Sequence, residues 1–160
     1  LTTIIQAQIN VWYIFPLLPL SLMFLISVIA ETNRAPFDLP EAESELVAGF
    51  FTEHSSVPFV LFFLAEYASM ILMSTLVSML FLGGYLIPFV YFENPTFFSF
   101  EGLTLGLKAS LILFIYIWVR ASFPRLRYDQ LMSFTWTGML PLTLGFIILV
   151  PCILMAFEIA

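Results

Sequence analysis

The sequence predicts an all-α integral membrane protein of about four transmembrane helices, with a long acidic inner-side loop between the first two. Of its 160 residues, 61% are hydrophobic and only 10% are charged, and the mean hydropathy is +1.04. A soluble domain has about half apolar and a quarter charged residues, so this chain has too few charges to coat a soluble surface. Four stretches also approach the length of about 20 apolar residues that a spanning helix needs.

The four expected spans cover about residues 11–30, 59–82, 103–119 and 134–157. Proline inside a span is tolerable where neighbouring helices satisfy the carbonyl groups that it leaves without a donor, and the prolines concerned are Pro16, Pro19, Pro141 and Pro151. No repeat and no low-complexity linker interrupts the chain. We therefore expect one membrane domain over residues 1–160, with inner-side loops at residues 31–58 and 120–133.

The basic residues predict which side of the membrane each loop faces. Four of the five lie just after the first or the third span, and with four spans these two loops share a side. The positive-inside rule assigns that side to the cytoplasm or the mitochondrial matrix. The opposite loop, residues 83–102, contains Glu93 and Glu101 but no Lys or Arg. This agrees with the orientation and places both chain ends on the outer side.

Composition excludes several classes of site. The net charge of −6 argues against nucleic acid as a partner, because phosphate binding needs clustered Lys and Arg. One cysteine, Cys152, and one histidine, His54, leave no disulfide, zinc or haem site. The chain starts at Leu1 without the basic region of a signal peptide, so we expect a processed end, a split gene or a truncation. Aromatic belts at span ends explain Trp12, Trp118 and Trp136.

The loop after the first span combines acidic and apolar side chains. Like charges and poor solvation disfavour the ionised form of a carboxylate, so acids in such a loop are suited to passing protons. A solvated acidic turn is the alternative, but the interleaved apolar residues favour packing against a partner or a cavity. Its acids are Glu31, Asp38, Glu41, Glu43, Glu45 and Glu53, with only Arg34 to offset them, and its apolar residues include Phe37, Phe50 and Phe51.

Glu66 is the sharper signal, because it lies inside the second expected span, roughly 10 Å below its inner end at 1.5 Å per residue. A charged carboxylate facing lipid costs several kcal/mol, so we expect Glu66 to face the protein interior, protonated or hydrogen-bonded. The alternative is a single structural hydrogen bond between helices. Three arginines near the end of the third span could be membrane-surface anchors, partners of the acidic loop, or ligands for a polar head group; they are Arg120, Arg125 and Arg127.

Several long stretches resemble one known family. Residues 30–45 read AETNRAPFDLPEAESE and are followed by LVAGF, and the likeness continues through residues 62–67, 120–131 and 141–144. These stretches closely resemble subunit 1 of respiratory complex I, the membrane subunit of NADH:ubiquinone oxidoreductase that adjoins the quinone site. The resemblance covers essentially the whole chain, but only the C-terminal half of the family's eight helices. Two departures are Phe51, where the family usually has Asn, and His54, where it usually has Tyr.

The resemblance implies roles for two groups of residues. Quinone-chamber or loop residues would be Arg34, Phe37, Asp38, Phe50, Phe51, Arg120, Arg125 and Arg127. A proton relay from the chamber towards the pumping subunits would contain Glu31, Glu41, Glu43, Glu45, Glu53 and Glu66.

The resemblance also implies the setting in which the chain works. It would be one subunit of an NADH:ubiquinone reductase, with ubiquinone as substrate and no cofactor of its own. NADH, flavin and iron–sulfur chemistry would belong to other chains. Its partners would be the lipid bilayer, the peripheral-arm and neighbouring membrane subunits, and a separate chain that supplies the N-terminal half. The mitochondrial inner membrane is the expected location, with the bacterial plasma membrane as the alternative.

Two other classes remain as alternatives. A secondary transporter or ion-conducting protein would use the acid inside the span to bind a cation, but the chain lacks the internal symmetry of many transporters. A purely structural helix bundle would explain the spans and leave the acidic loop unexplained. Redox-linked quinone binding by the assembled complex separates the first class from these two.

Overall fold

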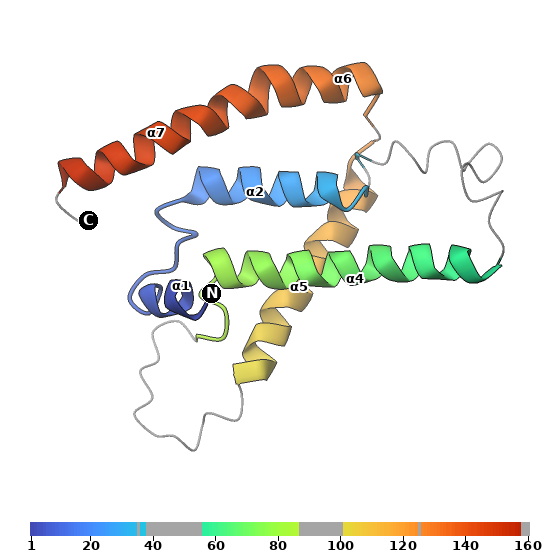
Figure 1. Cartoon of the computed structure of the whole chain (residues 1–160), viewed down its shortest axis with the longest axis horizontal. Helices are drawn as coiled ribbons and strands as arrows, with labels where there is room; N and C mark the ends of the chain where they lie inside the picture. Colours follow the sequence, from blue (N-terminus) through green and yellow to red (C-terminus); the bar gives the residue numbers. More distant parts are fainter. Residues whose placement is uncertain (35, 38–55, 87–100, 125, 158–160) are drawn as a thin grey trace. The chain divides into compact units, whose positions relative to one another are not determined.

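The computed structural model describes residues 1–34, 36–37, 56–86, 101–124 and 126–157, and every regular element among them is helical (Figure 1). The chain divides into two compact units, Leu1–Pro124 and Arg125–Ala160. The first contains α1 (Thr2–Ala7), α2 (Leu18–Glu31), α4 (Ser56–Phe81) and α5 (Glu101–Ser122). The second contains α6 (Tyr128–Ser133), the π-helical segment η3 (Phe134–Met139) and α7 (Leu140–Ala156).

Three helices are long and apolar enough to cross a membrane: Ser56–Phe81, Gly102–Ser122 and Tyr128–Ala156. They correspond to the second, third and fourth expected spans, and the all-α membrane class is confirmed at this level. Pro58 lies in the first turn of α4. Proline is tolerated there because the N–H group that it lacks would have no partner within the helix. The α5 helix ends at Ser122, two residues before Pro124, since the residue before a proline disfavours helical backbone.

The first expected span differs from the structure. Its helix, α2, starts at Leu18 rather than near residue 11, and residues 13–17 form turns. Pro16 has no N–H group to donate and disfavours helical backbone at Phe15, whereas Pro19 is accommodated in the first turn of α2. The 14 residues of α2 extend about 21 Å, less than the roughly 30 Å hydrocarbon core. The count of four spanning helices therefore stays a prediction.

Helices extend into the edges of the two ranges that were predicted to be loops. Glu31 still belongs to α2, and α4 already begins at Ser56. Within residues 120–133, the helix α5 continues to Ser122 and α6 begins at Tyr128. The α6 start is favoured by Asp129 in its first turn, because a negative charge there complements the helix dipole.

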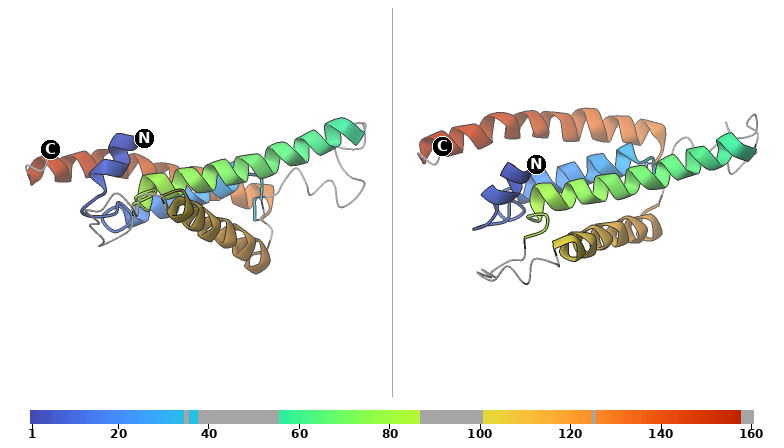
Figure 2. Two further views of the ribbon diagram at one scale, coloured as in Figure 1. Left: turned by 90° about the horizontal axis from the view of Figure 1, so that it is seen from below. Right: turned by 60° about the horizontal axis from the view of Figure 1, so that its bottom comes forward.

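In the first unit, α2 lies beside α4, and α4 also packs against α5 (Figures 1 and 2). One face of α4 is buried, and its residues recur every three or four positions, as the helical period requires. The aromatic rings of Phe24 on α2 and Phe81 on α4 join the two helices, with centroids 5.6 Å apart. The buried face of α4 consists of Met70, Ser74, Val77, Ser78 and Phe81.

The described part of the second unit is one continuous helix from Tyr128 to Ala156 (Figure 2). Its hydrogen-bond pattern widens at η3. The Leu140 N–H group donates to the Thr135 carbonyl, five residues back. Pro141, the next residue, cannot donate, and its ring would clash with the carbonyl of Thr137 in a regular helix. The π-helical segment thus accommodates Pro141 within the helix itself, whereas the sequence analysis expected neighbouring helices to do so.

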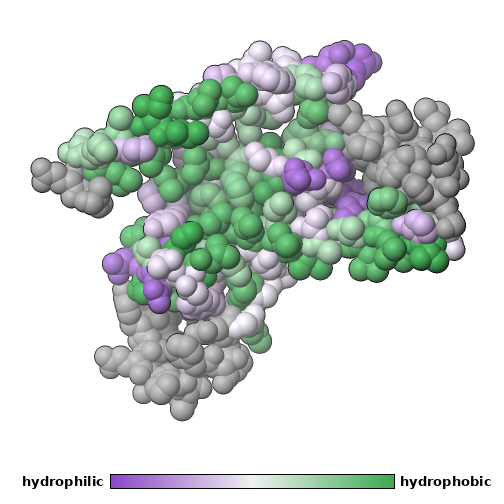
Figure 3. Space-filling view, in the orientation of Figure 1, coloured by the Kyte–Doolittle hydropathy of each residue, from purple (hydrophilic) through white to green (hydrophobic). Residues whose placement is uncertain are grey.

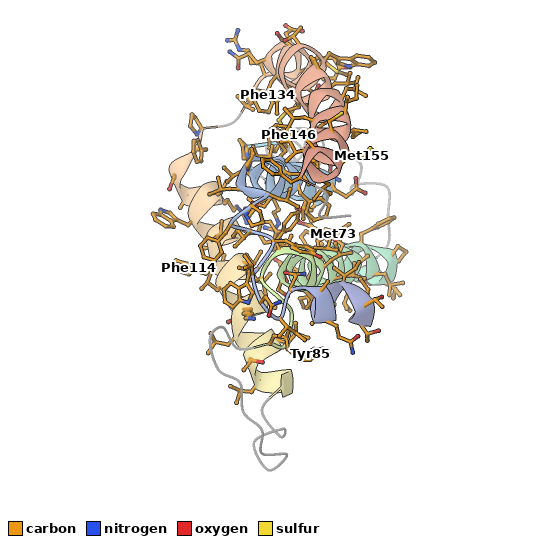
Figure 4. The ribbon with its side chains drawn as sticks, turned by 90° about the vertical axis from the view of Figure 1, so that its left-hand side faces the viewer. Met73, Tyr85, Phe114, Phe134, Phe146 and Met155 are labelled. Atoms are coloured by element: carbon orange, nitrogen blue, oxygen red, sulfur yellow. The ribbon has the colours of Figure 1, made fainter. Side chains whose placement is uncertain are left out.

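Apolar side chains cover much of the visible surface (Figure 3). No residue of α7 is buried, and Phe114 on α5, labelled in Figure 4, is 62% exposed. Exposed apolar area of this extent is typical of surfaces that contact lipid or other protein.

Candidate functional site

A tight turn after α2 places Arg34 beside α4. The Thr32 hydroxyl donates to the carbonyls of Val28 and Ile29 and so satisfies the end of the helix. Asn33 adopts a left-handed backbone conformation with φ of 49°, which is common just after a helix and which Asn tolerates better than most residues. The turn then continues with the Phe37 N–H group donating to the Arg34 carbonyl at 2.8 Å.

Arg34 and Glu66 form an ion pair that is largely shielded from solvent. The Nε atom of Arg34 lies 2.8 Å from Oε1 of Glu66, and the two side chains are only 10% and 19% exposed. The Arg34 guanidinium carbon also lies 5.2 Å from the centre of the Tyr67 ring. In the part of the chain that the structure describes, neither Nε nor Oε1 has a well-aligned hydrogen bond. The contact is therefore electrostatic attraction at short range, without an aligned N–H···O bond.

The position of Glu66 explains why this pair forms. Glu66 continues the buried face of α4 at a spacing of four residues from Met70 and eight from Ser74. Because α4 begins at Ser56, Glu66 lies roughly 15 Å along the helix, deeper than the 10 Å expected from the sequence. Glu66 does face neighbouring residues of the protein, and its partner is the cation of Arg34.

Such a pair has two chemically distinct states. With Arg34 in place, negative charge on the Glu66 carboxylate has a compensating cation 2.8 Å away. Without a counter-ion, a carboxylate in apolar surroundings is strongly disfavoured and becomes neutral by taking up a proton. The geometry therefore links the charge on Glu66 to the position of Arg34.

Two other predicted site residues that the structure describes in the first unit, Glu31 and Arg120, take no part in this ion pair. Glu31 is exposed at the end of α2, and Arg120 is exposed in the last turn of α5. Arg127 is exposed in the second unit, where its backbone N–H group donates to the Gln130 side chain at 3.3 Å. The others lie outside the described residues: Asp38, Glu41, Glu43, Glu45, Phe50, Phe51, Glu53 and Arg125.

A second polar cluster, at the C-terminal end of α4, was missed by the sequence reasoning. We call it the α4 cap and define it by Gln8, Trp12, Gly83, Gly84 and Lys108. The Lys108 Nζ atom donates to three backbone carbonyls and lies 4.5 Å from the centre of the Trp12 ring. A lysine inside an expected span is itself a signal of a special site. The sequence analysis used the basic residues only to orient the chain in the membrane, and so it overlooked Lys108. Trp12, which was assigned to an aromatic belt, also contacts the Lys108 ammonium group.

The described residues offer no metal site, since no three His, Cys, Asp or Glu side chains among them could hold an ion together.

Comparisons with known proteins agree with this picture. The family described as NADH dehydrogenase matches residues 1–151. The chain is 57% identical to NADH-ubiquinone oxidoreductase chain 1 of Mycosarcoma maydis, covering 100% of this chain and 49% of the relative. It is 54% identical to the protein of the same name from Metridium senile, with 99% and 46% covered. It is 50% identical to an NADH-quinone oxidoreductase subunit of Rhodospirillum centenum, with 99% and 46% covered.

The chain thus spans about half the length of the curated relatives it matches. The family match extends from the first residue into the second unit, as far as residue 151. The likeness to subunit 1 of respiratory complex I, first seen around Arg34 and Glu66, is confirmed by these relatives. This chain belongs to the NADH dehydrogenase family.

Proposed function

We propose that this chain is part of the membrane subunit of a proton-translocating NADH:ubiquinone oxidoreductase. In this role it forms part of the ubiquinone chamber and of a glutamate relay that couples quinone reduction to proton translocation. The names of its relatives support the enzyme, and the Arg34–Glu66 pair supports the relay.

In this proposal, the chain works as one subunit of the enzyme and binds no cofactor itself. Ubiquinone is the substrate, and other subunits of the complex carry the NADH and redox chemistry. The location is the mitochondrial inner membrane, or the plasma membrane in a bacterial source, with the acidic loop on the matrix or cytoplasmic side. Three helices of spanning length support the membrane setting.

The observation that carries the relay is the ion pair itself. Arg34 lies at the start of the acidic segment, four positions before Asp38. A new negative charge near that segment would attract the Arg34 guanidinium, and such an attraction is worth roughly 4 kcal/mol at 4 Å for an effective dielectric constant of about 20. Glu66 would then lose its counter-ion.

The consequence is a proton movement at a stated atom. A carboxylate left alone in apolar surroundings takes up a proton, because the neutral form needs no counter-ion. Return of Arg34 restores the 2.8 Å contact between Nε and Oε1, and the proton on Glu66 is released. Quinone reduction, which changes charge in the chamber, would in this way drive one protonation cycle at Glu66.

A secondary transporter or ion-conducting protein is the alternative function. There, Glu66 would bind a cation directly. The guanidinium of Arg34 already occupies the position beside Oε1, and its positive charge would repel a second cation. The ion pair and the family match both favour the coupling subunit.

The decisive variant is Glu66→Gln in the assembled membrane complex, because glutamine keeps the shape of the side chain and cannot ionise. We expect assembly and NADH:quinone electron transfer to persist while proton pumping per electron falls steeply. Thr75→Ala is the matched control, since Thr75 lies on the same helix and its hydroxyl donates to the Leu72 carbonyl of that helix. Normal pumping per electron in a fully assembled Glu66→Gln complex would rule out the relay role.

A further inference from the structure

The last four carbonyl groups of α4 all have hydrogen-bond donors, although this end of the helix lies among apolar helices. The last four carbonyls of a helix have no partner within the helix, and in an apolar medium each must find a donor elsewhere. The donors are the N–H groups of Leu82 and Gly84 for Ser78, the side-chain amide of Gln8 for Met79 and Leu80, and the N–H group of Ile14 for Phe81.

Lys108 extends this set of bonds beyond the helix. Its Nζ atom lies 2.7 Å from the Leu82 carbonyl, 2.8 Å from that of Gly84 and 2.6 Å from that of Leu86. Carbonyls only accept, so these three contacts use all three N–H donors of an ammonium group. The positive charge also complements the negative end of the α4 dipole. Lys108, which belongs to α5, thus binds the end of α4 from the side.

The turn that follows α4 leaves little room for movement. Gly83 and Gly84 have φ values of 72° and 55°, a backbone conformation that residues with a side chain rarely adopt. A Cβ atom on Gly83 would lie 2.9 Å from Nε1 of Trp12, and one on Gly84 would lie 2.9 Å from Cδ1 of Ile5. The α4 cap therefore fixes the end of α4 against both α5 and the N-terminal segment.

A fixed end determines where Glu66 lies. About 22 Å of helix separate Glu66 from Phe81 at 1.5 Å per residue. That stretch contains neither proline nor glycine, the usual causes of kinks, so a shift of the cap along the helix axis would move Glu66 by the same amount. The Arg34–Glu66 pair depends on one 2.8 Å contact, which such a shift would break.

We propose that Lys108 is a positioning residue that holds α4 at the axial position where Glu66 meets Arg34. It acts through the helix and does not touch the substrate. This inference rests on the proposed function of Glu66, and it adds that coupling depends on a residue at the far end of the same helix.

The test uses the assembled complex with Lys108→Met, which keeps the apolar stem and removes the ammonium. Two quantities are measured: hydrogen exchange of the backbone amides in residues 78–86, and proton pumping per electron during NADH:quinone turnover. Ser110→Ala is the matched control, because Ser110 is exposed on α5 and bonds only the Leu107 carbonyl. Lys108→Arg tests rescue by a second cation, and Trp12→Leu is a milder variant that removes only the ring.

We expect Lys108→Met to raise the rate of hydrogen exchange in residues 78–86 by about tenfold or more. Without the ammonium group, the three carbonyls lose a shared donor and the turn opens more often. Pumping per electron should fall while quinone reduction continues, Lys108→Arg should restore part of it, and Ser110→Ala should match the unmodified complex. If Lys108→Met fails to assemble, Trp12→Leu is expected to show the same two changes at smaller size.

Two results would overturn the inference. One is unchanged exchange in residues 78–86 of the Lys108→Met complex, which would mean that Lys108 does not hold the cap. The other is raised exchange with full pumping per electron, while Glu66→Gln measured in parallel loses pumping. Full pumping in Glu66→Gln as well would instead refute the proposed function of Glu66.

Discussion

Two charged groups lie at different points along α4, and they are held in different ways. Glu66, on the helix itself, is compensated by a single contact, the 2.8 Å approach of Arg34 Nε to Oε1. Lys108, which reaches the C-terminal end of α4 from α5, is held by three backbone carbonyls between 2.6 and 2.8 Å away and by the face of the Trp12 ring. Both groups lie in helices of spanning length.

The difference separates a group whose single partner can move away from one whose three partners are fixed by the backbone. Backbone carbonyls in a packed turn have no freedom to leave Lys108, and an ammonium with all donors in use gains nothing from a new partner. Arg34 is different, because it lies in a turn, has five N–H donors, and precedes an acid-rich segment. The α4 cap is suited to fixing the helix, and the Arg34–Glu66 pair is suited to switching.

The largest expected effect comes from removing the cation of the switching pair. Arg34→Met leaves the Glu66 carboxylate without a counter-ion, and breaking a buried pair in this way costs about 3–5 kcal/mol. The thermal stability of the assembled complex should fall sharply. The double variant Arg34→Met with Glu66→Gln should be more stable than Arg34→Met alone, since no charge is left unpaired. Simple additivity of the two single changes would contradict a direct pair.

The next effect concerns the α4 cap. Gln8 is fully buried and bonds the carbonyls of Met79 and Leu80 and the N–H group of Gly83. Gln8→Leu leaves these groups without partners, at a cost of about 1–3 kcal/mol for each, so the thermal midpoint of the complex should drop. Gln6→Leu is the matched control, because Gln6 is exposed two residues away. Equal stability of the two variants would show that the cap contributes little.

The smallest effect concerns the second contact of Arg34. Tyr67 is 52% exposed, and its ring centre lies 5.2 Å from the guanidinium carbon. An exposed cation–π contact contributes about 0.5–1 kcal/mol. Tyr67→Leu should therefore lower the stability of the complex slightly, and Tyr67→Phe, which keeps the ring, should not. A loss with Tyr67→Phe equal to that with Tyr67→Leu would assign the effect to the hydroxyl group.

Parts of this fold follow from sequence periodicity and parts do not. Continuous apolar stretches locate α4, α5 and the long helix of the second unit, because a spanning helix must satisfy its backbone internally. The same reasoning overestimates the first span, since Pro16 interrupts a stretch that is apolar but not helical throughout. The mean hydropathy of a segment does not show which of its residues lack a backbone N–H group, and so it does not show where a helix can begin.

The candidate site, too, could be predicted from the sequence only in part. The cost of a carboxylate facing lipid predicts that Glu66 lies on a protein-facing side of its helix. The helical period places Met70 and Ser74 on the same side. The pairing of Glu66 with Arg34 depends on the axial offset between α2 and α4 and on the left-handed turn at Asn33, which periodicity does not specify. Lys108 was predictable as an unusual charge within a span. Its three carbonyl partners come from a turn whose shape depends on Gly83 and Gly84.

Reduction-induced infrared difference spectroscopy of the assembled complex tests the central claim most directly, because it detects protonation of carboxyl groups. If Glu66 takes up a proton when ubiquinone is reduced, the unmodified complex will show a protonated carboxyl band that is absent in Glu66→Gln and retained in Thr75→Ala. Identical difference spectra in the unmodified and Glu66→Gln complexes would contradict the account.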